Sequence, residues 1–328
     1  AGGERFPLNQ VLFAAILGVG VALSGLFAWR AHLYQQELQR QHMQSHLDFV
    51  KVRLDYGLTH AKQVMWAFSD YFSLLGQIRR QDFEAFAQAS LRSHPELISF
   101  DWHPVITGQY RHWFERQARA QGLSAYQITE PGDQGAPVTA APRPEYAPRL
   151  FHASNRPDFE PHPGLDLLAC QPLRPALEKA REGDRLAAAL WDPLRLRPGQ
   201  RTFAIILPVR HATNSLSLET RDENFRGYIV GVLDLEPLLA DLRDELQALG
   251  VDFVLSVDGQ LAYSTTPGML MPAGDKPGHL QSTFRALDQQ WLVSLVGNAN
   301  LQSGTLGFLP WLLLFSGLTT TTLAAIYV

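Results

Sequence analysis

Residues 8–29 read LNQVLFAAILGVGVALSGLFAW, a run of 22 residues without one charged side chain. About 20 consecutive apolar residues in a helix are enough to cross the hydrocarbon core of a bilayer. A cleaved signal peptide is the alternative interpretation. It is disfavoured by the length of the run and by Arg30, which stands where small cleavage-site residues would be expected. We expect a first transmembrane helix here, within an N-terminal segment of residues 1–30.

A second uncharged run covers residues 306–328, with Trp311 near its start and Tyr327 near its end, as suits the membrane–water interface. A buried core helix is the alternative for this run. Two spans place both chain ends on one side of the membrane and the segment between them on the other. Long loops cross the membrane largely regardless of their charge, so charge does not set the orientation. We expect a two-pass protein of the inner (plasma) membrane with a periplasmic or extracellular domain.

The segment after the first run carries an amphipathic pattern and no proline between residues 8 and 70. Apolar side chains recur every three or four residues, at Leu47, Val50, Leu54, Leu58, Ala61, Met65, Phe68 and Phe72. This spacing predicts one helical stripe, and therefore an unbroken helix that leaves the membrane as a stalk over residues 31–79. Gly57 is the candidate break. The stripe either packs on the domain or forms the seam of a parallel homodimer, and both remain open.

The remainder of the chain alternates between helical and strand-like segments. Helices are predicted over residues 81–92, 110–121, 173–181 and 238–249, and strands over 97–102, 125–129, 202–210, 227–234, 251–257, 260–264, 283–287 and 290–296. Asp258-Gly259 between two strand runs is typical of a hairpin turn. The expected fold class is α+β, with the long stalk helix followed by two PAS-like lobes and bracketed by two transmembrane helices. We place a membrane-distal lobe at 80–213, a membrane-proximal lobe at 214–304 and the second span at 305–328.

Composition and motifs exclude several functions. Lys+Arg 28 against Asp+Glu 32 gives a net charge of -4, which argues against a nucleic-acid partner. The single Cys170 cannot form an internal disulfide. The four histidines at positions 103, 112, 152 and 162 are scattered and give no HExxH pattern, so we predict no metal site. Without a nucleophile elbow or a glycine-rich phosphate loop, we expect no cofactor and no enzymatic activity in this chain.

Several short motifs occur in a characteristic order over about residues 100–235. They are DWHPV at 101–105, Arg111 and Phe114-Glu115, YQITE at 126–130, RPEYAP at 143–148, GLD at 164–166 and ALEKAREG at 176–183. In this order and spacing they resemble the CHASE domains of plant cytokinin receptors and of bacterial transmembrane sensors. The resemblance implies two PAS-like lobes behind a long helix, with a small-molecule ligand held in the membrane-distal lobe.

The resemblance also implies a set of ligand-binding residues. In the plant receptors an aspartate of a Leu-Asp motif contacts the adenine ring of the ligand, and that position falls on Asp166. The other pocket positions of the family fall near Tyr146, Phe151, Leu190 and Leu207. An adenine-type ligand is one possibility that the family suggests for this chain. CHASE domains precede histidine kinases as well as diguanylate cyclases and phosphodiesterases, and we expect such an output domain after the second span.

The residues around Asp166 allow two interpretations. Asp166 lies between Leu165 and Leu167-Leu168, and a carboxylate in such apolar surroundings must be paired or accept hydrogen bonds. A ligand donor would serve, and so would the N-terminus of a following helix, because Asp is a favoured N-cap. Arg111 and Glu115 are spaced for an i,i+4 ion pair.

The sequence therefore predicts the ligand-sensing and signal-transducing region of a receptor. The alternative is a membrane-anchored structural or scaffolding protein without a ligand, which would need no cavity with convergent polar groups.

Overall fold

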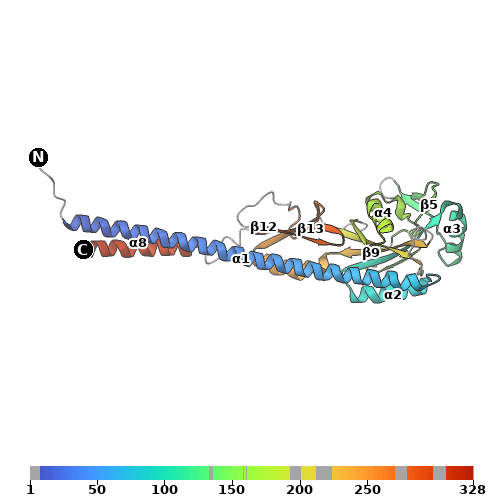
Figure 1. The fold of residues 1–328 in the computed structure, drawn as a ribbon, viewed down its shortest axis with the longest axis horizontal. Coiled ribbons are helices and arrows are strands. Elements are labelled where there is room, and N and C mark those ends of the chain that lie inside the picture. The colour runs from blue at the N-terminus through green and yellow to red at the C-terminus, as the bar shows by residue number, and fades with distance from the viewer. Residues whose placement is uncertain are drawn as a thin grey trace.

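The structure, a computed structural model, describes residues 8–132, 136–157, 159, 161–192, 201–211, 224–269, 279–297 and 308–327. Helix α1 (Leu8–Leu74) runs along almost the whole length of the molecule, and both chain ends lie at the same end of it (Figure 1). The helix continues without interruption through residues 29–38 and through Gly57. The prediction of one unbroken helix is therefore confirmed. At Gly57 a Cβ atom would lie 2.6 Å from Leu238, so glycine permits close packing here.

The predicted apolar stripe of α1 is buried within a single chain. Its eight members from Leu47 to Phe72 are all 0–1% exposed and belong to the main hydrophobic core. The intramolecular interpretation of the stripe is thus correct, and a dimer seam through Leu47, Leu54 and Leu58 is wrong, because these side chains are buried in the core of a single chain. Arg226 donates to the carbonyl oxygens of Phe72 and Leu75 at 2.9 and 2.7 Å, and so caps the C-terminus of α1.

The first sheet has five antiparallel strands in the order β6-β1-β9-β8-β7. Their bounds are β1 (Leu97–Pro104), β6 (Phe151–Ser154), β7 (Ala187–Leu190), β8 (Thr202–Arg210) and β9 (Phe225–Asp234). One face packs on α1 and on α2 (Arg80–Ser93), where Phe68 contacts Phe83, Phe86 and Phe100. This aromatic cluster fixes the sheet on the end of α1.

Short elements complete this part of the chain, and the last three of them cover the other face of the sheet. They are β2 (Ile106–Thr107), η1 (Gly108–Tyr110), α3 (Arg111–Ala120), β3 (Thr129–Pro131), β4 (Pro137–Thr139), β5 (Glu145–Tyr146), η3 (Leu167–Ala169), η4 (Gln171–Leu173) and α4 (Arg174–Gly183). In Figure 1 α3, β5 and α4 lie together at the end of the molecule away from both chain ends. We call this sheet, α2 and these short elements the distal lobe.

The second sheet has four antiparallel strands in the order β11-β10-β13-β12. They are β10 (Val251–Val257), β11 (Gln260–Ser264), β12 (His279–Ala286) and β13 (Gln289–Gly297), preceded by helix α6 (Glu236–Ala248). The predicted Asp258-Gly259 hairpin joins β10 to β11, and both residues have positive φ, as a type I′ turn requires. We call this sheet with α6 the proximal lobe, since it lies nearer the chain ends.

The two lobes share one core. Phe203 of β8 stacks on Trp291 of β13 with ring centroids 5.0 Å apart, and Gln289 donates to the carbonyl of Ala188 at 3.0 Å. Lys179 of α4 forms an ion pair with Asp288 at 2.7 Å. The apolar cluster therefore continues from α2 through both sheets along α1.

Helix α8 (Leu309–Tyr327) returns alongside the N-terminal part of α1 (Figure 1). Small residues let the two backbones approach. A Cβ atom on Gly20 would lie 2.0 Å from the side chain of Thr321, and one on Gly317 would lie 2.2 Å from Ser24. We call this helix pair the arm.

The sequence placed two boundaries incorrectly. The predicted division at 213/214 separates β9 from the distal lobe, whereas β9 is hydrogen-bonded between β1 and β8 in the middle of the distal sheet. The pairing of β9 with β1, which lies far earlier in the chain, leaves no local signal. The strand predicted over residues 125–129 begins only at Thr129; Tyr126 and Ile128 before it are buried against Ala118 of α3 without forming a strand.

Candidate functional site

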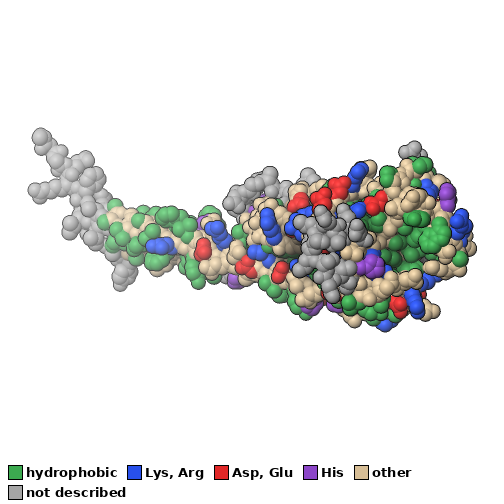
Figure 2. Space-filling view, turned by 45° about the vertical axis from the view of Figure 1, so that its right-hand side comes forward, with side chains coloured by type: hydrophobic (Ala, Val, Ile, Leu, Met, Phe, Trp, Pro, Cys, Tyr) green, Lys and Arg blue, Asp and Glu red, His purple; other side chains and the backbone are tan. Residues whose placement is uncertain are grey.

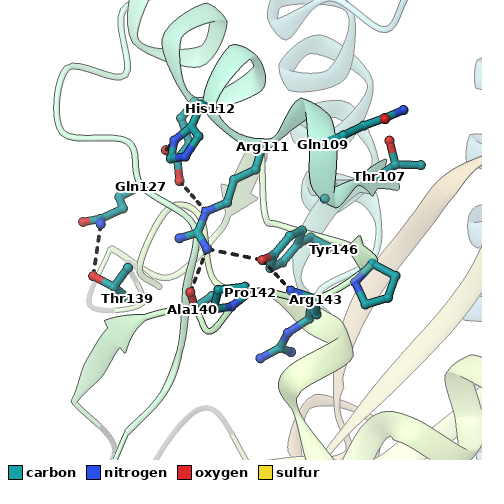
Figure 3. Close-up of a pocket in the computed structure, with 13 residues that line it drawn as sticks. Thr107, Gln109, Arg111, His112, Gln127, Thr139, Ala140, Pro142, Arg143 and Tyr146 are labelled. Atoms are coloured by element: carbon teal, nitrogen blue, oxygen red, sulfur yellow. Dashed lines mark hydrogen bonds and ion pairs between the residues drawn. The ribbon is translucent and has the colours of Figure 1, made fainter.

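Two cavities flank residues 143–146 in the distal lobe. The larger, which we call the outer cavity, has a volume of about 880 Å³ and lies between α3 and the small β2–β5 and β3–β4 sheets (Figure 3). Its polar and charged lining consists of Thr107, Gln109, Arg111, His112, Glu115, Gln127, Thr139, Arg143 and Tyr146. Both volume and lining suit a small polar ligand.

The smaller cavity, which we call the inner cavity, has a volume of about 470 Å³ and lies between α4 and the distal sheet. Its lining is Arg143, Pro144, Glu145, Leu168, Arg174, Leu177, Glu178, Arg181 and Tyr228. Arg143 and Pro144 therefore line both cavities and form the wall between them. Ion pairs Arg174–Glu178 and Arg181–Glu145 leave the rim close to electroneutral.

Arg111 holds the outer cavity together. Its guanidinium donates to Glu115 at 3.2 Å and to the carbonyl oxygens of Ala140 at 2.7 Å and Ile128 at 3.1 Å, and it reaches the hydroxyl of Tyr146 at 3.3 Å (Figure 3). The predicted i,i+4 ion pair with Glu115 is confirmed, but it lies inside the lobe and not on its surface. Burial opposes the charge of Arg111, yet these partners raise the pKa of its guanidinium further. The residue is a structural anchor of α3.

Asp166 occupies an enclosed position beside both cavities. Its Oδ1 accepts from the backbone N–H groups of Ala147 at 2.8 Å and Leu168 at 3.2 Å, and its Oδ2 accepts from Arg143 at 3.1 Å. Burial raises the pKa of this carboxyl group, against the hydrogen bond from Ala147 and the charge of Arg143. The contact with Leu168 caps η3, so the N-cap interpretation is confirmed. Because both oxygens already have partners, a ligand would have to compete with Arg143 for them.

Arg143 bridges two carboxylates. It pairs with Asp166 through one nitrogen and with Glu130 through the other. About a quarter of its side chain is exposed, whereas Asp166 is fully buried. Arg143 is therefore the most accessible member of the charged group, and it is the one that a ligand in either cavity would meet.

The structure separates the other predicted ligand residues. Tyr146 lines the outer cavity, and its hydroxyl donates to Ala141 at 2.9 Å. Phe151 and Leu207 belong to the core on the α1 face of the distal sheet, and Leu190 packs against that same core. Side chains alternate between the faces of a strand, so the neighbours of Leu207 on β8 face α4 instead. A ligand in either cavity would not touch these three residues.

A buried polar row was missed by the sequence analysis. On the α4 face of the distal sheet, Asp101 of β1 pairs through Oδ1 with Arg149 at 3.0 Å and with His152 of β6 at 2.6 Å. Burial acts against the charge, but Arg149 and His152 outweigh it and lower the pKa of Asp101 to about 2. Burial and Arg149 lower the pKa of His103 to about 4. The sequence pattern that could have revealed this row is the alternation Asp-x-His within an otherwise apolar strand.

In the described part of the chain, no group of three or more His, Cys, Asp or Glu side chains could hold a metal ion. One described helix, α1, contains a stretch long and apolar enough to span a membrane, within residues 14–74.

The cavities lie at one end of the molecule and the arm at the other, and α1 joins them. A family model described as CHASE domain matches residues 76–267, more than half of the chain. The chain therefore belongs to the CHASE domain family of receptor sensor domains.

Solved structures show a weaker likeness. The ligand-binding domain of the Pseudomonas aeruginosa PAO1 amino acid chemoreceptor PctC, in complex with GABA, is 17% identical and has a TM-score of 0.41, covering 81% of this chain and 97% of that one. The Campylobacter jejuni chemoreceptor Tlp3 domain with L-valine is 9% identical, with a TM-score of 0.40 and coverage of 86% and 98%. The extracellular domain of the putative histidine kinase soHK1S-Z6 is 12% identical, with a TM-score of 0.40 and coverage of 74% and 88%. No curated protein matches the chain.

Proposed function

We propose that this chain is the extracytoplasmic sensing region of a two-pass receptor, which binds a small molecule in the distal lobe and transmits binding through α1 and α8. The observation that carries the proposal is the continuity of α1. One helix contacts the sheet of the distal lobe, the sheet of the proximal lobe and α8 in the arm. A shift of the distal sheet on α1 would therefore reach the arm without passing through a loop.

The arm supports the membrane assignment. Side chains of Leu26, Phe27 and Trp29 on α1 and of Trp311 and Phe315 on α8 point outward, at 48–64% exposure. On the face shown in Figure 2, apolar side chains cover much of the arm, while charged side chains gather over the lobes. Apolar side chains facing outward around a helix pair suit lipid and not water. We place the arm in the inner (plasma) membrane and both lobes on its outer side.

The two cavities support a small-molecule ligand over a purely scaffolding role. Convergent charged and aromatic groups around a concave space are the usual marks of a ligand site. We propose Arg143 and Tyr146 as ligand contacts, with Asp166 fixing Arg143 in place. An adenine ring bound through Asp166, as in the plant receptors, would first have to displace Arg143.

We further propose that the receptor works as a parallel homodimer and continues into a histidine kinase or a cyclic-di-GMP enzyme. The outward face of α1 offers Phe49, Val52 and Tyr56, which are 53–66% exposed and spaced by three and four residues. Single cysteines along this face should crosslink with a helical period. The full-length sequence identifies the output domain directly.

The test is a thermal-shift screen of the chain in lipid nanodiscs against a library of small metabolites. A ligand of the distal lobe should raise the melting temperature of the wild type. It should bind Arg143→Ala roughly tenfold to a hundredfold more weakly, as expected for loss of a charged hydrogen bond of about 1.5–3 kcal/mol. Arg201→Ala is the matched control, since Arg201 pairs with Asp192 outside both cavities. A screen without a single stabilising compound would favour the scaffolding alternative.

A further inference from the structure

Helix α4 contacts the inner cavity and the proximal lobe at the same time. The cavity is lined by its residues Arg174, Leu177, Glu178 and Arg181. Lys179, the residue after Glu178, extends instead to the turn between β12 and β13. Its Nζ lies 2.7 Å from Oδ2 of Asp288 and donates to the backbone carbonyl oxygen of Asp288 at 3.3 Å. One short helix therefore connects a candidate ligand site with the other lobe.

The turn between β12 and β13 consists of Leu287 and Asp288, and it is held by more than this ion pair. Leu287 is buried and belongs to the main core. Gln289, directly after the turn, donates to the carbonyl oxygen of Ala188 in β7 at 3.0 Å. Arg185, which follows α4, lies 3.7 Å from Asp288. Three consecutive residues are thus fixed by the core, by α4 and by β7, so the turn is docked on the distal lobe.

The backbone of this turn is unusual for its sequence. Leu287 and Asp288 have φ of 50° and 66°, the positive values that a two-residue type I′ turn requires. Asp-Gly is a favoured sequence for such a turn, as at Asp258-Gly259, whereas a bulky residue such as Leu seldom adopts positive φ. A disfavoured conformation persists where the surrounding contacts impose it. The core contact of Leu287 and the bond from Gln289 to β7 supply such contacts, which marks the turn as a constrained junction.

Helix α4 rests on the distal sheet largely through small side chains. The buried cluster between them contains five alanines from α4, β7 and β8, which are Ala176, Ala180, Ala187, Ala189 and Ala204. Alanine side chains interlock less than branched ones, so a helix that packs through them can slide with little repacking. Small sliding movements of packed helices are one of the common forms of conformational change in proteins. The contact between α4 and β7 therefore permits movement of α4 along the sheet.

The hairpin that carries the turn lies on α1. Both β12 and β13 contact α1 within the proximal lobe. The two strands pair without a register shift, from His279 opposite Val296 to Ala286 opposite Gln289, so the hairpin is a continuous ladder. A displacement of the turn would therefore reach α1 through two paired strands.

We propose that α4 and the β12–β13 turn form a joint through which occupation of the inner cavity reaches the proximal lobe. A molecule in the cavity displaces α4 along β7, and the contact of Lys179 with Asp288 carries the turn with it. This inference rests on the proposed function and names how that site is read out. The two side chains of the ion pair are 40% and 38% exposed, and such pairs contribute little to stability. Removing the pair should therefore uncouple the lobes and leave them folded.

The test places a tethered group in the inner cavity of the chain in lipid nanodiscs. Leu168, which lines this cavity, is replaced by cysteine and reacted with benzyl methanethiosulfonate. Hydrogen exchange of residues 174–183 in α4 and of residues 279–297 in the hairpin is compared before and after labelling. Labelling should change the exchange rate of both segments at least threefold.

Two controls accompany the label. Thr139→Cys carries the same group in the outer cavity and should leave the exchange of residues 279–297 unchanged. The wild type treated with the same reagent shows whether the buried Cys170 reacts.

Two substitutions of Lys179 locate the joint. Lys179→Met removes the charge and keeps the apolar stem. In the labelled Leu168→Cys protein it should retain the change in residues 174–183 and abolish the change in residues 279–297. Lys179→Arg keeps the charge and should retain both changes. The melting temperatures of the unlabelled variants should agree within about 4 °C, as expected for an exposed ion pair.

The outcomes separate the two proposals. A label that leaves residues 279–297 unchanged in the Leu168→Cys protein would overturn the joint and leave the small-molecule sensor standing, with α1 as its direct route to the arm. A change in residues 279–297 that survives Lys179→Met, or that the label in the outer cavity also produces, would overturn the joint as well. A metabolite screen without a bound compound would contradict the proposed function alone, because the tethered group needs no natural ligand.

Discussion

The two lobes rest on the same helix but bury different chemistry. The distal lobe encloses a charged row around Asp101, Arg149 and His103, together with two cavities. In the described part of the proximal lobe the polar side chains that are buried are hydroxyl groups, such as Ser256, Ser264 and Ser294. Hydroxyl groups cost little to bury, whereas charges are expensive unless they are paired. The difference suits a distal lobe that recognises a ligand and a proximal lobe that serves as a packed connector.

Removing one arginine from each lobe should give the largest contrast. Arg149→Met leaves the carboxylate of Asp101 buried without its arginine partner, and we expect a loss of about 3–5 kcal/mol in the free energy of unfolding. Arg243→Met removes the partner of Glu236 and Asp244 in the proximal lobe, where the side chains are partly exposed, and should cost about 1 kcal/mol or less. Urea unfolding measures both. Equal losses for the two variants would show that the ion pairs of the two lobes contribute equally to stability.

Lowering the pH should give the next largest effect. It should destabilise the distal lobe, which contains the titrating groups His103 and Asp101. The pKa of His103 is about 6.5 in the unfolded chain and about 4 in the folded one, so the unfolded chain takes up the proton first. This contribution to stability is complete above pH 6.5 and is lost as the pH falls to 4, by about 3 kcal/mol. Asp101, with its folded pKa lowered to about 2, adds a further loss only below about pH 3.8.

The measurement is the melting temperature of the wild type and of His103→Asn between pH 7 and pH 4. The variant keeps the donor to Ala147 but cannot titrate, so its curve should be flatter over that interval. Parallel curves for the two proteins would assign the acid sensitivity to other groups.

A smaller contrast concerns two aspartates that each bind neighbouring backbone or hydroxyl groups. Asp166→Ala removes an acceptor from Ala147, Leu168 and Arg143 and should cost about 2 kcal/mol. Asp252→Ala in the proximal lobe removes an acceptor from the hydroxyls of Thr265 and Thr266 and should cost about 1 kcal/mol. Denaturant midpoints give both values. A stable Asp166→Ala protein that has lost its ligand would instead support direct ligand contact.

The smallest expected effects come from two glycines with positive φ. Gly259 in the β10–β11 hairpin has φ 79°, and Gly122 after α3 has φ 96°, each with open space around its Cα. Replacing either by alanine should cost about 1 kcal/mol through backbone strain alone. Hydrogen exchange should show the lost protection in the proximal lobe for Gly259→Ala and in the distal lobe for Gly122→Ala. Loss spread evenly over both lobes would mean that they unfold as one unit.

Elements with a strong local signal could be predicted from the sequence. The stripe of α1 and the Asp-Gly hairpin follow from spacing and turn chemistry, and both are present. The place of β9 in the middle of the distal sheet could not be predicted, because one of its partners, β1, comes from a distant part of the chain, although the other, β8, directly precedes it. The proximal sheet, by contrast, is built largely from hairpins and was found nearly complete.

The site was predicted less well than the fold. Thr202–Arg210 is buried on both faces of the sheet, so its sequence carries no alternation to show that Leu207 faces α1 while Ile206 faces α4. Asp166 was identified as a buried carboxylate that needs partners, and that much is confirmed. Its main side-chain partner, Arg143, could not be identified, since 23 residues separate the two.

Because Arg226 caps the end of α1 in the distal lobe, the full length of this helix lies between the distal sheet and the arm. At about 1.5 Å per residue, the 67 residues of α1 form a rod roughly 100 Å long. Arg226 holds its tip to β9, and the close contacts of Gly20 with Thr321 and of Gly317 with Ser24 hold its base against α8. In mechanical terms it is a rigid rod that the proximal lobe supports between these two contacts. A tilt of a few degrees at the distal sheet would therefore arrive at the base as a sideways movement of several ångströms, large enough to change which side chains of the arm meet.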